Sequence, residues 1–211
     1  MTINEVNYVS LDQSGSLEPQ PDPVNSKSKA PGVRIGFVAN GSSVQQTLYY
    51  FSTDISNDGI KKSGFLPFCQ TFATGNSFVK SASYLMHETY FSSIRDFLLS
   101  NTETLVQDDS GIPCSFFTEE KWEMKFHGNY PVPITLFKNY GQPLLYDYYK
   151  TTKPAALDFG IGYRHRANES TLMVFTRKSG TLADSKLESV KAKPPLRALP
   201  VAEEPPLQSN Q

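Results

Sequence analysis

The sequence predicts an α/β fold: a single domain with one mixed β-sheet covered by helices and a β-hairpin at each end. Except for Tyr8, every Phe, Tyr and Trp of the 211-residue chain lies between Val33 and Lys178. Burial of such large side chains offsets the entropy of ordering a chain. Within this region, segments with the two-residue period of strands alternate with segments of helical period. This alternation favours a mixed sheet, and an α+β arrangement is the alternative class.

Composition divides the chain into three parts. Residues 1–31 form a predicted flexible lead-in, because Pro, Ser, Gly and charged residues dominate most of it, and only 5–10 alternates enough for a short strand. Residues 32–179 form the predicted globular domain. The tail, 180–211, is rich in proline and has no aromatic residue, which predicts a disordered segment with polyproline character.

The globular part begins with a predicted hairpin and a helix. Apolar residues alternate over 33–38 and 44–53, and the pair Asn40-Gly41 between them favours a type I′ turn. Apolar residues then recur with helical spacing over 65–72, which places Pro67 in the first turn, and Gly75 is the expected end of this helix.

The middle of the chain alternates between strands and helices. A strand is predicted at 77–85, an amphipathic helix at 89–100, and a short strand at 102–107 that ends in a turn. Residues 111–141 are aromatic but aperiodic and contain three prolines, so an ordered, irregular loop with short extended pieces is expected.

The last predicted elements are a helix and a second hairpin. The helix covers 143–149, with Pro143 in its first turn. The strands of the hairpin are 157–164 and 171–178, in both of which apolar residues alternate with other residues.

Composition also bears on the class of function. Lys and Arg number 20, Asp and Glu number 21, and the net charge is −1, which argues against a nucleic-acid surface. No segment is apolar enough for a membrane span, the N-terminus has no signal-peptide pattern, and no motif predicts a cofactor. Cys69 and Cys114 fit neither a metal-ligand spacing nor a CxxC motif. They are two buried thiols or, in an oxidising compartment, one disulfide.

Asp108 and Asp109 are the first candidate site. They follow a predicted strand in a turn, where α/β proteins often place metal ligands or acid–base groups. Paired carboxylates can bind a cation or share a proton. The competing interpretation is that Asp, Ser and Gly only form the turn.

The strand predicted at 157–164 and the loop after it carry the other candidates. Asp158 and Arg164 lie on one face with two glycines between them, which leaves an open strip where a ligand or a packed helix could approach. Arg164, His165 and Arg166 could bind a phosphate or a carboxylate, or could simply form an exposed hairpin tip.

The motifs LYYFSTD, QDDSGIP and LDFGIGYR resemble those of a family of uncharacterised bacterial proteins, over about residues 30–178. Members of that family are longer. The resemblance implies an exported or periplasmic protein with a secretion signal and a further N-terminal half, with which this part of the chain would associate. The family has no established activity, so the resemblance assigns no catalytic residue.

Three functional hypotheses follow. The leading one is a non-catalytic module, binding or structural, within a larger exported bacterial protein, because the chain has a well-defined core region and no assembled reaction motif. The first alternative is a metal- or acid/base-dependent hydrolase that joins Asp108 and Asp109 to Asp158, Arg164 and His165. The second alternative is a truncated product with no separate function.

Overall fold

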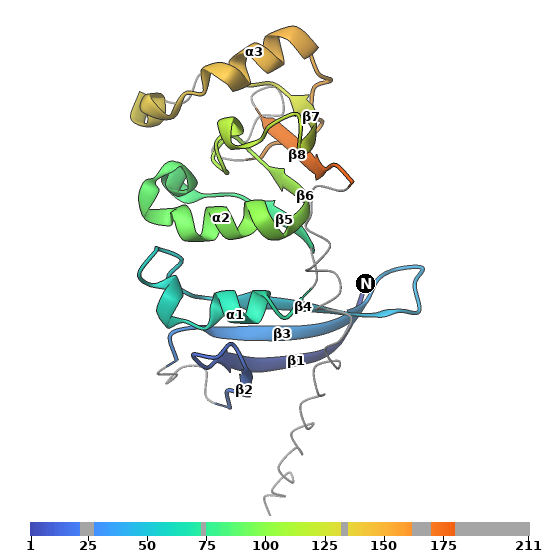
Figure 1. Cartoon of the computed structure of the whole chain (residues 1–211). Coiled ribbons are helices and arrows are strands. Elements are labelled where there is room, and N and C mark those ends of the chain that lie inside the picture. Colours follow the sequence, from blue (N-terminus) through green and yellow to red (C-terminus); the bar gives the residue numbers. More distant parts are fainter. Residues whose placement is uncertain (22–27, 73–74, 132–134, 162–169, 180–211) are drawn as a thin grey trace, which may run out of the picture.

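Two four-stranded β-sheets form the framework of the molecule (Figure 1). The computed structural model describes residues 1–21, 28–72, 75–131, 135–161 and 170–179. The first sheet is antiparallel, with the strand order β2-β1-β3-β4, and the second is mixed, with the order β5-β6-β8-β7. The fold has the predicted α/β class, but the prediction of a single sheet is wrong.

The strands are β1 (Thr2–Leu11), β2 (Leu17–Pro19), β3 (Pro31–Val38), β4 (Gln45–Phe51), β5 (Gly75–Val79), β6 (Thr102–Gln107), β7 (Trp122–Gly128) and β8 (Thr171–Arg177). The α-helices are α1 (Phe65–Cys69), α2 (Ser92–Asn101) and α3 (Pro143–Thr152). Five 3₁₀ segments connect them: η1 (Ile60–Lys62), η2 (Ala82–His87), η3 (Thr89–Phe91), η4 (Cys114–Phe116) and η5 (Thr135–Tyr140). No helix in these described ranges is both long and apolar enough to cross a membrane.

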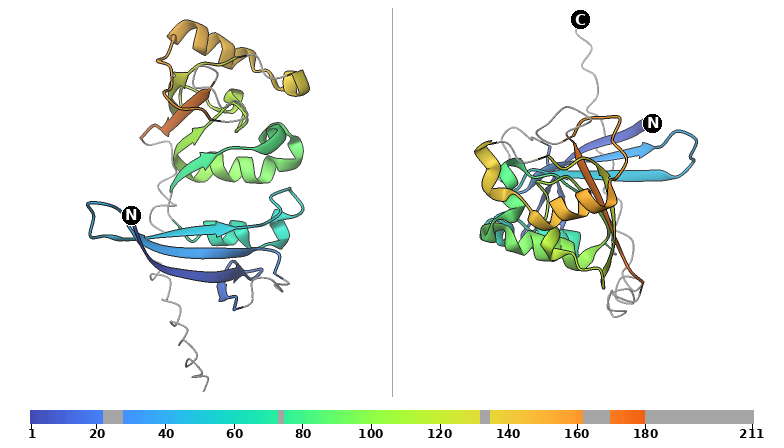
Figure 2. Two further views of the ribbon diagram at one scale, coloured as in Figure 1. Left: turned by 180° about the vertical axis from the view of Figure 1, so that it is seen from behind. Right: turned by 90° about the horizontal axis from the view of Figure 1, so that it is seen from above.

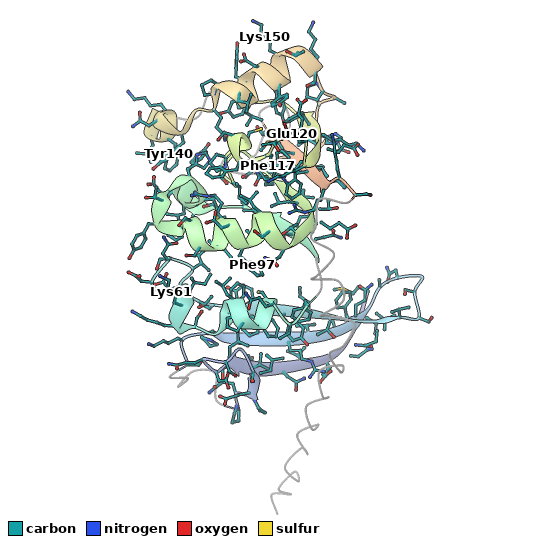
Figure 3. The ribbon with its side chains drawn as sticks, viewed as in Figure 1. Lys61, Phe97, Phe117, Glu120, Tyr140 and Lys150 are labelled. Carbon is teal, nitrogen blue, oxygen red and sulfur yellow. The ribbon has the colours of Figure 1, made fainter. Side chains whose placement is uncertain are left out.

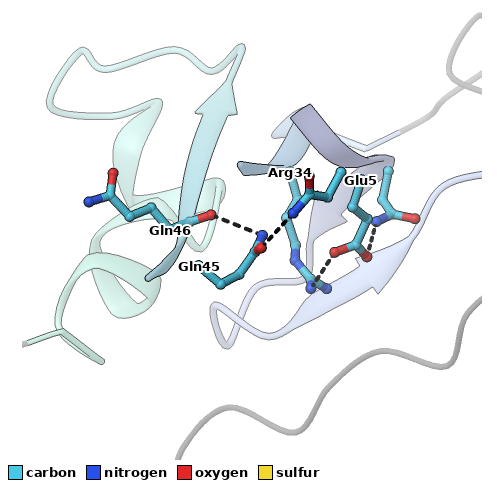
Figure 4. A network of polar contacts seen from close by, with 6 residues as sticks. Glu5, Arg34, Gln45 and Gln46 are labelled. Atoms are coloured by element: carbon cyan, nitrogen blue, oxygen red, sulfur yellow. Dashed lines mark hydrogen bonds and ion pairs between the residues drawn. The ribbon is translucent and has the colours of Figure 1, made fainter. Parts of the chain in front are cut away.

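β1 corrects the predicted flexible lead-in. It pairs with β3 along nearly its whole length, from Thr2 opposite Val38 to Ser10 opposite Pro31. Arg34 on β3 and Glu5 on β1 strengthen the pairing with an ion pair of 3.1 Å (Figure 4). Composition does not reveal this strand, because backbone hydrogen bonds to β3 supply much of what holds it.

The first hairpin is confirmed as β3 and β4, which pair from Gly32–Phe51 to Val38–Gln45. Its turn differs from the prediction. The Ser42 N–H donates to the Ala39 carbonyl at 3.1 Å, but of the two central residues only Gly41 has a positive φ, 76°. A type I′ turn needs positive φ at both positions, so the predicted turn type is wrong.

The predicted second hairpin is also wrong. Its second strand exists as β8, but β8 pairs with β6 along one edge and with β7 along the other. A strand has only two hydrogen-bonding edges, so neither edge of β8 remains for residues 157–161, which form no strand. β7 lies in the region expected to be irregular, and residues 162–169 and 180–211 are outside the described residues.

The three α-helices appear where periodicity predicts them. α1 carries Pro67 inside its first turn and ends at Cys69, earlier than the Gly75 boundary expected from the sequence. α2 starts three residues later than expected, after the 3₁₀ turn η3. α3 has Pro143 at its first position and runs three residues further than predicted. The strand predicted at 77–85 is shorter in the structure, because β5 ends at Val79.

Two apolar clusters form the interior, and α1 joins them. The larger lies on the second sheet, where Leu105, Met173 and Phe175 are fully buried and Phe117 stacks on Phe175 with ring centroids 3.7 Å apart (Figure 3). The smaller lies between α1 and the first sheet. Phe65 packs against both clusters, so the two sheets are parts of one packed unit in the described chain.

Candidate functional site

The turn after β6 is built by Asp108 and Ser110. One carboxylate oxygen of Asp108, Oδ1, accepts hydrogen bonds from the Ser110 backbone N–H at 3.0 Å and from its hydroxyl at 2.5 Å. The Ser110 hydroxyl in turn accepts the Ser81 N–H at 3.1 Å. Asp108 and Ser110 are both buried. These contacts are typical of an Asx turn, so Asp108 has a structural role here.

Gln107 closes the same turn with its side-chain amide. Its Nε2 donates to the Ile112 carbonyl at 2.6 Å, and its Oε1 accepts the Ile112 N–H at 2.8 Å. A Cβ on Gly111 would lie only 2.4 Å from Oε1 of Gln107. Gly111 is therefore required because the Gln107 side chain passes directly against its backbone.

Asp109 is held by a tyrosine in a rare conformation. The Tyr84 hydroxyl donates to Oδ2 of Asp109 at 2.5 Å. Burial, and then this hydrogen bond, raise the pKa of Tyr84, so the phenol stays protonated and donates. Ser83 and Tyr84 have φ of 52° and 56°, left-handed values that are uncommon for any residue with a bulky side chain.

His87 is a neutral ring that meets Tyr84 edge to face, with ring centroids 5.1 Å apart, and contacts the backbone of Asp109. Burial lowers the pKa of His87, and the hydrogen bond to the Asp109 carbonyl opposes this only in part. Its Nε2 is 3.3 Å from that carbonyl oxygen. A carbonyl can only accept, so Nε2 carries the proton and Nδ1 is an acceptor.

Tyr140 completes an aromatic cluster around His87. Its ring stacks on Tyr84 with centroids 5.1 Å apart and meets His87 edge to face at 5.6 Å. Its hydroxyl donates to Oε1 of Glu88 at 2.6 Å. Figure 3 labels Tyr140 at the end of η5, on the side of the molecule that carries α2. Two members of the cluster, His87 and Tyr140, form one wall of the space beside it.

A buried arginine supports this wall from behind. Nη1 of Arg95 donates to the carbonyls of Met86 and Glu88 at 2.9 and 3.3 Å. Its guanidinium lies 4.4 Å from the centre of the Phe116 ring, within the range of a cation–π contact. Arg95 thus fixes the backbone on both sides of His87.

These elements enclose a pocket of about 250 Å³. Nine residues line it: His87, Pro113, Ser115, Asn139, Tyr140, Gly141, Gln142, Pro143 and Leu144. None of them is Asp, Glu, Lys or Arg. Gln142 is fixed by the Cys114 N–H, which donates to its Oε1 at 2.7 Å, and by the Asp109 carbonyl, which accepts from its Nε2 at 3.0 Å.

Asp108 and Asp109 are close in sequence to Pro113 of the lining, but neither residue lines the pocket. Asp158 is exposed and belongs to no strand. The predicted open strip between Asp158 and Arg164 is therefore absent from its described part, residues 158–161. Arg164, His165 and Arg166 are outside the described residues. Among the residues that the structure describes, no three of His, Cys, Asp and Glu are placed to hold a metal ion.

The two cysteines are free thiols, and the disulfide alternative is wrong. They belong to different apolar clusters. Burial raises the pKa of Cys69 to about 11 and that of Cys114 to about 12. The thiolate is the reactive form, so neither side chain is suited to nucleophilic chemistry near neutral pH.

The sequence contains little that predicts the pocket. His87, Asn139, Tyr140 and Gln142 come from segments with no motif, and their convergence depends on the loop 111–141 folding back over η2. The aromatic content of that loop was the available signal, and it suits core burial equally well. Comparisons with family models, curated protein sequences and solved structures each found no match to this chain.

Proposed function

We propose that this chain is a binding module whose pocket beside His87 takes one small, uncharged, hydroxyl-rich ligand of about monosaccharide size. The observation that carries the proposal is the lining itself: it offers neutral polar groups and apolar surface, and no side chain that is charged at neutral pH. Specific pockets usually combine apolar walls with a few convergent polar groups.

The size of the pocket limits the ligand. Drug-sized ligands occupy pockets of roughly 300–1,000 Å³, and this one measures about 250 Å³. A single sugar ring or a molecule of similar volume matches this space. Tyr140, Pro143 and Leu144 supply apolar contact. Ser115 and Asn139 are exposed and supply a hydroxyl and an amide group.

The uncharged lining argues against charged ligands. A phosphate, carboxylate or ammonium group that enters the pocket loses water and finds no opposite charge in the lining, which is costly for any ion. A neutral ligand loses less, because each hydroxyl can exchange a water for an amide, a hydroxyl or Nδ1 of His87.

The hydrolase alternative has less support. Asp108 and Asp109 are engaged by Ser110 and Tyr84, and neither lines the pocket. The proposal also keeps the leading sequence hypothesis of a module in an exported bacterial protein, with a further N-terminal half as partner, on the strength of the three motifs alone.

Thermal unfolding of the full chain tests the proposal. The probes are glucose, galactose and N-acetylglucosamine, each at about 10 mM, against the charged analogues glucuronic acid and glucosamine. For a dissociation constant near 1 mM, a ligand that binds only the folded state should raise Tm by about 3–5 °C. The charged analogues should leave Tm unchanged.

Variants locate the effect. Asn139→Ala and Ser115→Ala should abolish the rise in Tm, because each removes a polar group of the lining. Asn76→Ala, an exposed asparagine on β5 outside the pocket, should keep it. A rise that persists in the pocket variants, or one produced only by the charged analogues, contradicts the proposal.

A further inference from the structure

One face of the first sheet is apolar and faces away from both clusters of the interior. Residues directly opposite each other in paired strands share a face, and the register places eight apolar side chains together: Ile3, Val6, Tyr8, Val33, Ile35, Phe37, Leu48 and Tyr50. We call this set the outer face. Seen from behind, β1, β3 and β4 lie in front and no helix or strand of the described chain covers them (Figure 2, left).

The opposite side of the same sheet faces α1 at one end and is polar at the other. Tyr49 and Phe51 pack edge to face against Phe68 of α1. Beyond α1, this inner side carries Arg34 and Glu5 as an ion pair. An antiparallel sheet normally turns its apolar side to the core and its polar side to water. Here the arrangement is reversed over half of the sheet, which indicates that the outer face is buried in an assembly.

The area of the outer face is that of a small specific interface. Its five most exposed side chains, Ile3, Val6, Tyr8, Leu48 and Tyr50, are 51–65% exposed. With a full area of roughly 200 Å² for a large apolar side chain, they present about 500–600 Å² per chain. Two such faces together bury about 1,000–1,200 Å², which reaches the lower limit for a specific interface.

We infer that the outer face binds the outer face of a second copy of this chain, in a two-fold symmetric sandwich of sheets. A two-fold interface requires one surface to be complementary to itself. The outer face meets this requirement because none of its eight side chains is charged. Among the described strands, the charged residue on the same side of the sheet is Glu18 of β2, which lies opposite Ser10 at the edge of the face. Antiparallel sheets pack well in this way, with the strands of the two sheets about 30° apart.

Sedimentation velocity of the full chain between about 1 and 100 µM tests the inference, because this range covers the micromolar dissociation constants of small specific interfaces. The expected result is a particle of about twice the 23.5 kDa mass of one chain. Tyr50→Lys and Leu48→Lys each place like charges across the two-fold axis, and each should raise the dissociation constant at least about tenfold.

Tyr146→Lys is the matched control. Tyr146 is 52% exposed on α3, against 65% for Tyr50 on β4, so the chemistry and exposure are alike and only the location differs. This variant should remain dimeric. Near-UV circular dichroism of each variant confirms that it is folded, and an edge strand such as β4 accepts lysine well.

Two results overturn the inference. One is a mass of a single chain for the unmodified protein at every concentration, which leaves the face for a different partner. The other is a dimer that survives both Leu48→Lys and Tyr50→Lys, which places the interface elsewhere. The outcome is independent of ligand binding, because no residue of the outer face lines the pocket.

Discussion

At the scale of single residues, side chains replace backbone contacts in the turn after β6. The Gln107 amide pairs with both backbone groups of Ile112, and the Asp108 carboxylate holds Ser110. Each contact is buried, where an unpaired polar group is costly. The residues of the motif QDDSGI therefore form a turn and show no sign of a catalytic role. This turn lies next to the residues that line the pocket.

Gln107 and Gly111 should show strong coupling in unfolding experiments. Gly111→Ala alone should lower the free energy of unfolding by about 1–3 kcal/mol, because the new Cβ collides with the Gln107 side chain. That side chain cannot move without breaking its hydrogen bonds to the backbone of Ile112. In a Gln107→Gly background, the Gln107 side-chain atoms that the new Cβ would meet are gone, so the same change should cost less than about 0.5 kcal/mol. Urea unfolding of the four proteins measures the coupling, and purely additive costs would contradict the account.

His87 should make stability depend on pH. Burial lowers the pKa of His87 below its usual 6.5 in the folded state. As the pH falls through 6.5, His87 is therefore protonated in the unfolded chain while it stays neutral in the folded chain. Stability is therefore complete above about pH 7 and decreases as the pH falls below 6.5.

Urea unfolding of the His87→Gln variant from pH 7.5 to 5.5 isolates this effect. Glutamine can keep the hydrogen bond to the Asp109 carbonyl without titrating in this range, so this variant should lose less stability than the unmodified protein over the interval. His127→Gln is the control, since His127 is exposed, and should follow the unmodified protein. Equal slopes for all three proteins would argue against a half-buried, neutral His87.

At the scale of elements, α3 ends on a residue in an unfavourable conformation. Lys153 follows the helix with φ 45° and ψ 59°, and its N–H donates to the Tyr149 carbonyl. Glycine is the residue that adopts this left-handed geometry without strain. The helix thus ends where its geometry favours a glycine.

The same substitution should have opposite signs at two positions of α3. Lys153→Gly should raise the free energy of unfolding by about 0.5–1 kcal/mol, because it removes the left-handed strain. Lys150→Gly, inside the helix, should lower it by about 1 kcal/mol through lost helix propensity. Chemical denaturation of both variants measures the pair, and a loss of stability at position 153 would be inconsistent with a left-handed cap there.

Elements with strong local signals were predictable from the sequence, and elements held by distant partners were not. The three α-helices, β6 and the β3–β4 hairpin follow from periodicity and turn residues. β1 was underestimated because its pairing with β3, more than 20 residues away in sequence, holds it in place. The second hairpin failed because β6 and β7, remote in sequence, occupy both edges of β8. The pocket could not be predicted, because its residues come from η2, from the aperiodic segment 111–141 and from the start of α3, and meet only in the folded chain.

At the scale of the whole molecule, α1 couples the two sheets. Phe65 contacts both apolar clusters, and Phe68 lies within the cluster of the first sheet. A shared helix should make the two sheets unfold together, because loss of either cluster exposes apolar surface of α1.

Trp122 reports on this coupling. It is the only tryptophan of the chain and lies in the cluster of the second sheet. Phe68→Ala, in the other cluster, should lower the urea midpoint measured by Trp122 fluorescence, by an amount equivalent to about 3–4 kcal/mol. Tyr146→Ala, at an exposed site on α3, should shift it little. An unchanged midpoint for Phe68→Ala would show that the sheets unfold independently.

The central claim of the account is that the pocket beside His87 binds a small neutral ligand. The most direct measurement is an NMR titration of the ¹⁵N-labelled full chain with N-acetylglucosamine, glucose and galactose, with glucuronic acid as the charged comparison. The account predicts saturable shifts for at least one neutral sugar at the Asn139 side-chain amide and in residues 113–115 and 141–144. It predicts none for glucuronic acid and none in the Asn139→Ala variant. Shifts that cluster elsewhere would contradict it. So would the absence of any saturable shift up to about 50 mM ligand, a concentration well above a dissociation constant of about 1 mM.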